Sequence, residues 1–199
     1  MTTQVETGLA LKEWAGVIDA MLRGEQIVAL RKGGIREKAF LVQGRSFYLL
    51  PTFEHQAPEL VKPSFRPGLE CALQEQRDGQ GLIVRARADV TDCWEVDDEA
   101  RLNALAPYHV FTDDFVRTRF NWRPKQPLTV MLMRVFRLER PWLTGLPSGV
   151  GGCRSWLEIE SEAAPADAGP AVAEHEFDER AAALRGLLSD CPRAELSSR

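Results

Sequence analysis

Residues 82–96 read LIVRARADVTDCWEV, and apolar and polar side chains alternate along this stretch. The apolar set runs from Leu82 to Val96, and the intervening positions are mainly charged, with Arg85 and Asp89 among them. Side chains of a β-strand point alternately to the two faces of a sheet, so a period of two is typical of a strand with one buried and one solvated face. We therefore predict a long strand here, with its apolar face in the core.

Other strands are predicted on both sides of this one. Residues 128–138 are apolar on both faces apart from Thr129, Arg134 and Arg137, which is typical of a central strand. Shorter apolar runs bounded by glycine or proline predict strands at residues 26–30, 40–42, 46–50 and 154–159. Because short connections join the first three of these runs, we expect them to form an antiparallel meander.

Helices are predicted between the strands. Trp14, Val17, Ile18 and Met21 recur at intervals of three and four, so residues 9–23 are expected to form an amphipathic helix that covers the sheet. Further helices are predicted from Pro67, after the acidic residues 97–99, after Thr112 and around residues 177–188. The predicted fold class is α+β: a single domain with a mainly antiparallel sheet flanked by helices, plus a C-terminal appended helix.

The C-terminal region differs from the rest in composition. Residues 163–173 are mostly alanine, proline and glycine, which is typical of a flexible connector. The apolar residues that follow predict one amphipathic helix, either docked on the core, which is favoured, or used to bind a protein partner. We therefore expect a core domain at residues 1–160 and an appendage at 161–199, and we expect the core to stay folded after truncation at Ser161.

Composition limits the class of protein. The chain of 199 residues has a net charge of -4. Residues 157–199 carry ten acidic and four basic residues, a balance of -6, so the remaining residues carry +2. The first residues lack the features of a signal peptide and no apolar run could span a membrane, so we expect a cytoplasmic protein. The four cysteines are too widely spaced for a zinc or redox motif, and we expect them to be reduced and mostly buried.

The loop at residues 31–38, RKGGIREK, combines four cations and one carboxylate with two adjacent glycines. Glycines allow a positive φ, which can turn backbone amides toward a ligand and form an anion-binding nest. The loop therefore predicts a polyanion or phosphate site, whose residues are Arg31, Lys32, Gly33, Gly34, Arg36 and Lys38. Glu37 lies among these cations, and we expect it to orient them by ion pairing rather than to bind a metal.

Two further groups of residues are candidates for the same site. Thr52, Glu54, His55 and Gln56 follow the strand that ends at Leu50, and they supply a general base, a metal ligand and amide donors. A second basic cluster interleaves cations with aromatic rings, and its candidate nucleic-acid-binding residues are Arg119, Trp122, Arg123 and Lys125. Whether the Arg31–Lys38 loop and the Thr52–Gln56 loop meet depends on strand register, which the sequence leaves open.

Four separated motifs resemble a known family. They are ALKEWA at residues 10–15, LRKGGIRE at 30–37, LPTFEHQ at 50–56 and RFNWRPKQPL at 119–128. In this order they resemble the bacterial family called domain of unknown function 1802, over nearly everything up to Glu158. The resemblance implies no established activity. Some members look fused to a restriction-endonuclease domain of the Mrr type, which implies DNA defence or processing, but this chain has no such second domain.

Three functions follow from these observations, and none is an identified reaction, because GxSxG, P-loop, GxGxxG and HExxH motifs are all missing. The leading one is a nucleic-acid or nucleotide-phosphate binding module, with Trp122 or Tyr48 stacked on a base. The second is a metal-dependent phosphodiesterase or nuclease that uses Glu37, Glu54 and His55. The third is a protein-interaction partner that binds through the C-terminal helix. The sequence specifies no cofactor and no metal site.

Overall fold

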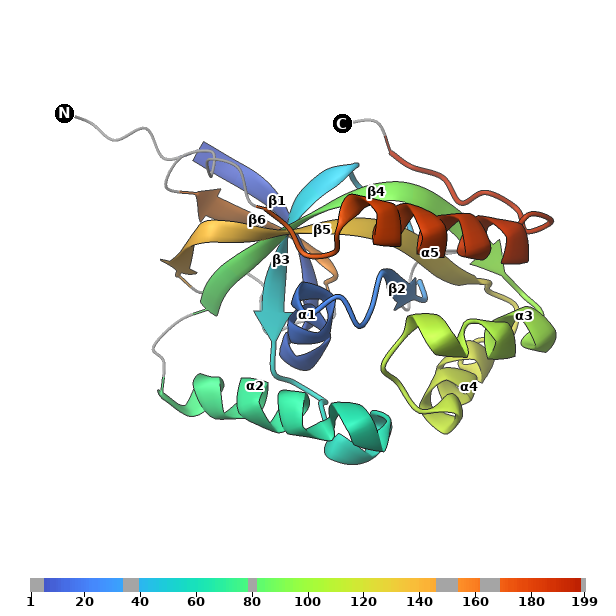
Figure 1. Cartoon of the computed structure of the whole chain (residues 1–199), viewed down its shortest axis with the longest axis horizontal. Helices are drawn as coiled ribbons and strands as arrows, with labels where there is room; N and C mark the ends of the chain where they lie inside the picture. Colours follow the sequence, from blue (N-terminus) through green and yellow to red (C-terminus); the bar gives the residue numbers. More distant parts are fainter. Residues whose placement is uncertain (1–5, 34–39, 79–81, 146–153, 162–168, 198–199) are drawn as a thin grey trace.

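A computed structural model describes residues 6–33, 40–78, 82–145, 154–161 and 169–197 (Figure 1). The strands are β1 (Glu6–Trp14), β2 (Val28–Arg31), β3 (Ser46–Thr52), β4 (Leu82–Val96), β5 (Leu128–Thr144), β6 (Trp156–Ser161) and β7 (Gly169–Pro170). The helices are α1 (Ala15–Leu22), α2 (Arg66–Asp78), α3 (Glu99–Ala104), α4 (Asp113–Asn121) and α5 (Glu174–Leu187). Among the described residues no helix is long and apolar enough to cross a membrane.

The strands form one mixed sheet of seven strands in the order β2-β5-β4-β3-β1-β6, with β7 added to β5. The pairing of β1 with β3 is parallel, and the other pairings are antiparallel. The predicted fold class, α+β with a mainly antiparallel sheet and a C-terminal helix, is therefore confirmed. The predicted strand at residues 82–96 is β4, and its alternation matches the observed burial except at the register shift between Val90 and Asp92. The predicted central strand is also correct, although β5 continues beyond residue 138 to Thr144.

Three predictions about the first half of the chain are wrong. Residues 9–14 belong to strand β1, and the predicted helix begins only at Ala15. Because β1 lies between β3 and β6, both of its edges are hydrogen-bonded, and this tertiary pairing outweighs a helical spacing that starts at Trp14. The predicted meander does not form either, since β2 pairs with β5 while β3 pairs with β4 and β1. Val42 makes a single bridge to Leu196 instead of the predicted strand.

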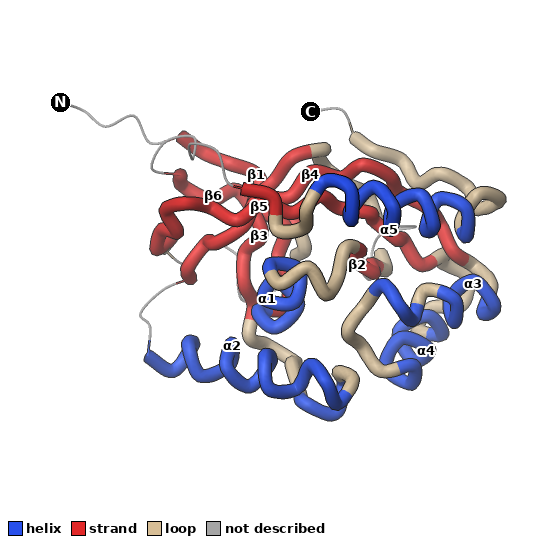
Figure 2. The backbone as a smooth tube through the Cα atoms, in the orientation of Figure 1, coloured by secondary structure: helices blue, strands red, loops and turns tan. Residues whose placement is uncertain are grey.

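Buried side chains form two clusters on the two faces of the sheet. Along β1, Leu11 belongs to the larger cluster and Ala10 to the smaller one, as expected for successive residues of a strand. The smaller cluster includes Leu138 of β5 and Ile159 of β6, which are not neighbouring strands, so the sheet curls around it. Helices α1 and α5 cover the other face and lie along the same side of the sheet in Figures 1 and 2.

Helix α5 is part of the main core. Phe177, Ala181, Leu184 and Leu188 are all buried in the larger cluster, so the apolar face of the helix is used within the chain. The connector predicted at residues 163–173 falls mostly outside the described residues. Asp92, at the register shift in β4, accepts hydrogen bonds from Arg185 Nε at 2.8 Å and from Arg193 Nη1 at 2.6 Å. These bonds fix α5 and the segment after it against β4.

The contact at Asp92 predicts a pH-dependent contribution to stability. Burial alone would raise the pKa of Asp92, but the hydrogen bonds from Arg185 and Arg193 outweigh burial and hold the pKa below its usual value. Such a group contributes stability that is present above the unfolded pKa of about 3.9 and is lost as the pH falls through the folded value. We expect Asp92→Asn to lower the free energy of unfolding at pH 7 and to lower it less at pH 3, as measured by urea denaturation. Asp178→Asn, at an exposed position of α5, is the control, and an Asp92 effect that does not change with pH would contradict the assignment.

Candidate nucleotide-binding pocket

A pocket of about 610 Å³ lies where β1, β2 and β3 end and α4 passes. Its lining residues are Lys12, Glu13, Trp14, Leu30, Arg31, Thr52, Glu54, His55, Phe111, Phe115, Val116, Arg119, Arg154 and Ser155. Arg31, the first residue of the predicted Arg31–Lys38 loop and here the last residue of β2, lines this pocket together with Thr52, Glu54 and His55. The volume lies within the range of roughly 300–1,000 Å³ that is usual for small-molecule sites.

A buried ion pair forms one wall of the pocket. Arg31 Nη2 lies 3.0 Å from Glu13 Oε2, and the two side chains are 11% and 9% exposed. Glu13 Oε1 also accepts a hydrogen bond of 2.8 Å from the backbone amide of Trp14, and Arg31 donates to the carbonyl of Lys12. Because β1 and β2 are not neighbours in the sheet, this pair joins strand ends that the curl of the sheet brings together.

A second guanidinium, from Arg119 of α4, lies beside this pair. Burial lowers the pKa of Arg119, the positive charge of Arg31 lowers it further, and Glu13 opposes both effects. Within the described part of the chain, the Nε atoms of Arg31 and Arg119 are buried and lack a hydrogen-bond partner. Two cations therefore share one carboxylate in a partly desolvated place, an arrangement that an anionic ligand would stabilise.

Aromatic rings form a second wall of the pocket. The ring centroids of Trp14 and Phe115 are 5.2 Å apart, those of Trp14 and Phe111 are 5.5 Å apart, and those of Phe111 and Phe115 are 5.0 Å apart. Phe111 is buried, while Trp14 and Phe115 keep part of their surface open. The pocket therefore offers exposed aromatic surface close to its cations, which suits a ligand with a planar ring and a negative charge.

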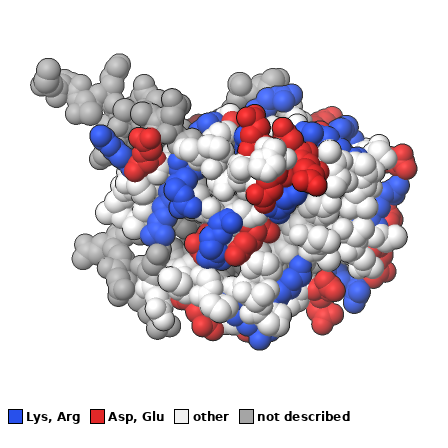
Figure 3. All heavy atoms as spheres, viewed as in Figure 1, with Lys and Arg blue, Asp and Glu red and all other residues white. Residues whose placement is uncertain are grey.

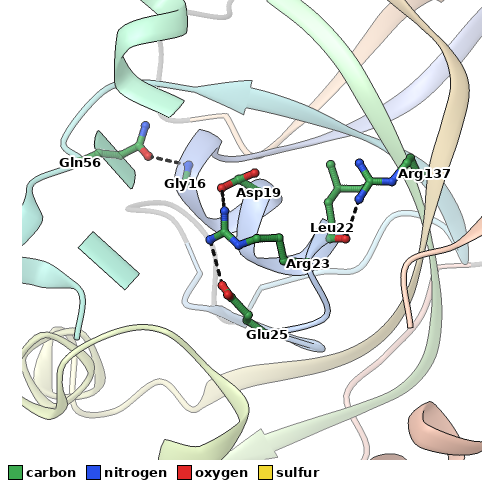
Figure 4. Close-up of polar contacts among 7 residues, drawn as sticks. All are labelled: Gly16, Asp19, Leu22, Arg23, Glu25, Gln56 and Arg137. Atoms are coloured by element: carbon green, nitrogen blue, oxygen red, sulfur yellow. Dashed lines mark hydrogen bonds and ion pairs between the residues drawn. The ribbon is translucent and has the colours of Figure 1, made fainter. Parts of the chain in front are cut away.

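Two side chains contact the ends of α1, the helix that follows Trp14 (Figure 4). Gln56 Oε1 accepts a hydrogen bond of 3.1 Å from the amide of Gly16 in the first turn of α1, and Arg137 donates one of 2.8 Å to the carbonyl of Leu22 in the last turn. These contacts satisfy backbone groups that a helix leaves unpaired at its two ends. Gln56, predicted to bind an anion, is thus used to fix the helix that follows Trp14.

Glu54 and His55 are exposed at the pocket. His55 has a φ of 59°, and the amide of Glu54 donates a hydrogen bond of 3.4 Å to the Thr52 hydroxyl. This tight turn directs the chain away from the end of β3. Among the described residues, no group of three His, Cys, Asp or Glu side chains is placed to hold a metal ion.

The remaining candidates from the Arg31–Lys38 loop are placed differently. Lys32 is 6% exposed, donates to the carbonyl of Phe120 near the C-terminal end of α4, and lies 5.2 Å from the centroid of the Phe120 ring. Burial, followed by the charge of Arg119, lowers the pKa of Lys32. Gly33 is also buried. The other predicted residues of this loop, Gly34, Arg36, Glu37 and Lys38, lie outside the described residues.

The second basic cluster divides between two places. Arg119 faces the pocket, whereas Trp122 is 45% exposed just after α4, outside the lining of the pocket. The Arg123 guanidinium lies 4.8 Å from the centroid of the Trp122 ring, and Lys125 is exposed. Tyr48, the other predicted stacking residue, packs edge-on against Trp142 and is not part of the pocket lining.

Several pocket residues were not predicted as site residues from the sequence. The sequence predicts a helix that contains Glu13 and Trp14, a helix that contains Phe115 and a strand that begins at Arg154, and it assigns no role to Phe111. One signal was present, because Glu13 and Trp14 belong to the first of the four motifs that resemble a family. The motif at residues 10–15 would have marked both residues as site candidates if the predicted helix had been set aside.

Solved structures of low sequence identity are similar to this chain. No curated protein matches the chain. The crystal structure of ASCH from Zymomonas mobilis is 12% identical with a TM-score of 0.45, over 94% of this chain and 97% of that one. One mutant form of that protein is 12% identical with a TM-score of 0.42, over 88% of this chain and 94% of that one. A second mutant form is 14% identical with a TM-score of 0.40, over 68% of this chain and 74% of that one.

The family match is more extensive. A family model described as Domain of unknown function (DUF1802) matches residues 10–183, which include the pocket and most of α5. The match passes the point near Glu158 where the resemblance was expected to end. It covers far more than half of the chain and agrees with the four sequence motifs, so the chain belongs to the DUF1802 family.

Proposed function

We propose that this protein is a nucleotide-phosphate or nucleic-acid binding module and that the pocket is its binding site. The observation that supports this function is the pair of guanidinium groups, Arg31 and Arg119, that line the pocket together and repel each other, while the buried carboxylate of Glu13 pairs with Arg31 and attracts Arg119. Guanidinium groups present several N–H donors in a planar arrangement that matches phosphate oxygens. A phosphate at this place would offset the repulsion between the two arginines.

The aromatic wall supplies the second requirement of a nucleotide site. Trp14 and Phe115 are partly exposed on the same pocket as the two arginines. Stacking of a base on an aromatic side chain contributes about 1–3 kcal/mol and tolerates any base. Trp14 and Phe115 are therefore the proposed stacking residues, in place of Trp122 and Tyr48, which were predicted from the sequence. Arg31 and Arg119 would bind the phosphate.

A metal-dependent phosphodiesterase is the second candidate, because Glu54 and His55 line the same pocket. A carboxylate and an imidazole beside a bound phosphate are suited to general acid–base chemistry or to metal binding. We rank this function below simple binding, since the two side chains are exposed. DNA defence or processing, the setting that the family resemblance implies, stays a prediction.

Arg119→Gln tests the proposed function without breaking the buried ion pair. A hydrogen bond to a charged group contributes about 1.5–3 kcal/mol, so we expect the affinity for a fluorescein-labelled single-stranded oligonucleotide to fall by roughly 10-fold or more. We also expect a shallower dependence of affinity on salt, because one phosphate contact is lost. Thermal stability should stay the same or rise, because a buried cation repelled by Arg31 is removed.

The matched control is Arg140→Gln, the same chemical change at an exposed position of β5. Fluorescence anisotropy at several salt concentrations, with thermal melting of each variant, supplies both measurements. A parent protein that binds no oligonucleotide or nucleotide at low salt would refute the proposed function. Equal losses in Arg119→Gln and Arg140→Gln would refute the pocket as the binding site.

A further inference from the structure

We propose that the ligand of this pocket is a nucleoside with a terminal phosphate monoester, and not a phosphodiester in the interior of a strand. This inference rests on the proposed function and makes its ligand specific. It depends on the net charge of the pocket lining, on the burial of the groups that would hold the phosphate, and on the size of the pocket.

Among the described residues that line the pocket, positively charged side chains outnumber negatively charged ones. Four are cationic, namely Lys12, Arg31, Arg119 and Arg154, and two are anionic, namely Glu13 and Glu54, so the balance is 4 − 2 = +2. A phosphate monoester carries about -1.5 to -2 charges near pH 7, because its second pKa is about 6. A phosphodiester carries a single negative charge. The monoester is therefore the better match to the pocket.

Burial strengthens this preference for a dianion. Arg31 and Glu13 are almost inaccessible to solvent, and burial and the charge of Arg31 both lower the pKa of Arg119. Charges separated from water interact more strongly, because the local dielectric constant is lower than that of bulk solvent. A second negative charge on the ligand therefore contributes more here than it would at an exposed surface.

The size of the pocket also favours a terminal group. A volume of about 610 Å³ suits one nucleotide. The arginines and the aromatic wall lie on the same pocket, so one ring and one phosphate would fill its two kinds of surface. An internal nucleotide would need room for the strand to continue from both of its phosphates, whereas a terminal nucleotide needs room on one side or none.

The experiment measures binding of matched ligands to the full chain by isothermal titration calorimetry. The ligands are the 5′- and 3′-monophosphates of the four ribonucleosides and the four deoxyribonucleosides. The tightest of them is then compared with its phosphate methyl ester, which keeps the base, the sugar and the phosphate but carries one charge fewer. We expect the monoester to bind at least 10-fold more tightly than the methyl ester, and we expect Arg119→Gln to reduce this ratio.

The pH dependence gives a second readout with a defined sign. Between pH 7.5 and pH 5.5 the monoester gains a proton, so its advantage over the methyl ester should shrink. The other titratable or charged groups that face the site are His55, Glu13, Glu54, Lys12 and the three arginines. His55→Gln removes the imidazole, and the advantage of the monoester should shrink in this variant as well.

Each outcome decides between the claims. Equal affinity for the monoester and its methyl ester would overturn the inference, and the proposed function would survive if Arg119→Gln weakened both. If the protein bound an oligonucleotide that has no terminal phosphate but bound no monophosphate, the inference would also be overturned and the proposed function would survive. No binding of any of these ligands would overturn the proposed function as well.

A phosphorylated trinucleotide identifies the source of the ligand if the inference holds. The same trinucleotide is titrated with a 5′-phosphate, with a 3′-phosphate and with neither. Affinity equal to that of the free monophosphate would indicate the phosphorylated end of a strand, and much weaker binding would indicate a free nucleotide. Both results support a terminal monoester as the recognised group.

Discussion

Deletion of residues 162–199 is expected to abolish the cooperative thermal unfolding transition. Phe177, Leu184 and Leu188 are each 3% exposed or less and belong to the main core. Burial of one such side chain contributes about 1.5–3 kcal/mol, so these three contribute roughly 4.5–9 kcal/mol. That sum is comparable with the whole stability of a typical domain, about 5–15 kcal/mol. From the packing of α5 we therefore expect that residues 1–160 do not fold alone, which differs from the expectation from sequence.

Calorimetry and near-UV circular dichroism of the truncated chain test this result, since both report on fixed tertiary packing. Leu184→Ala in the full chain removes part of the same packing, and we expect it to lower the free energy of unfolding by about 2–5 kcal/mol. Glu179→Gln, at an exposed position of the same helix, should have little effect. A truncated chain that melts cooperatively near the parent temperature would restore the boundary near residue 160 and make α5 a dispensable appendage.

Arg31→Met is expected to destabilise the protein by about 3–5 kcal/mol, because it removes the guanidinium that pairs with the buried Glu13 carboxylate at 3.0 Å. Glu13 is 9% exposed at its side chain, so water cannot easily replace the guanidinium. Denaturant unfolding of the variant measures the loss. The effect would be far larger than the roughly 0–1 kcal/mol expected for a cation on an exposed loop.

The double variant Glu13→Gln/Arg31→Met separates a charge effect from a packing effect. Glutamine keeps the oxygen that accepts the hydrogen bond from the Trp14 amide, and it removes the buried charge. We therefore expect the double variant to be more stable than Arg31→Met alone. A double variant that is less stable, by the sum of the two single losses, would show that the pair is not coupled in the folded protein.

The fold was predictable where local sequence determines structure. The alternation of β4, the apolar run of β5 and the Thr112 cap of α4 all correspond to observed elements, and the Thr112 hydroxyl accepts a hydrogen bond from the amide of Phe115. The boundary between β1 and α1 was not predictable in this way, because β1 depends on partners more than thirty residues away in β3 and in β6. Pairing at such distances leaves no periodic signal in the residues concerned.

The candidate site was predictable in part for the same reason. Arg31, Glu54, His55 and Arg119 were chosen by residue type and loop position, and all of them line the pocket. The partner of Arg31 was not predictable, since Glu37 is close in sequence whereas Glu13 is close in space. Lys32 and Gln56 have the chemistry of ligand-binding residues, but the structure places them at helix ends, a distinction that requires the fold.

The location of β1 in the sheet has a consequence for synthesis on the ribosome. This N-terminal strand pairs with β6, and Glu6 lies opposite Ser161. One edge of β1 therefore has no partner until β6 has emerged from the ribosome. Contacts between residues this far apart slow folding and leave strand edges exposed meanwhile. We expect the nascent chain to need protection from aggregation until β6 is available to pair with β1.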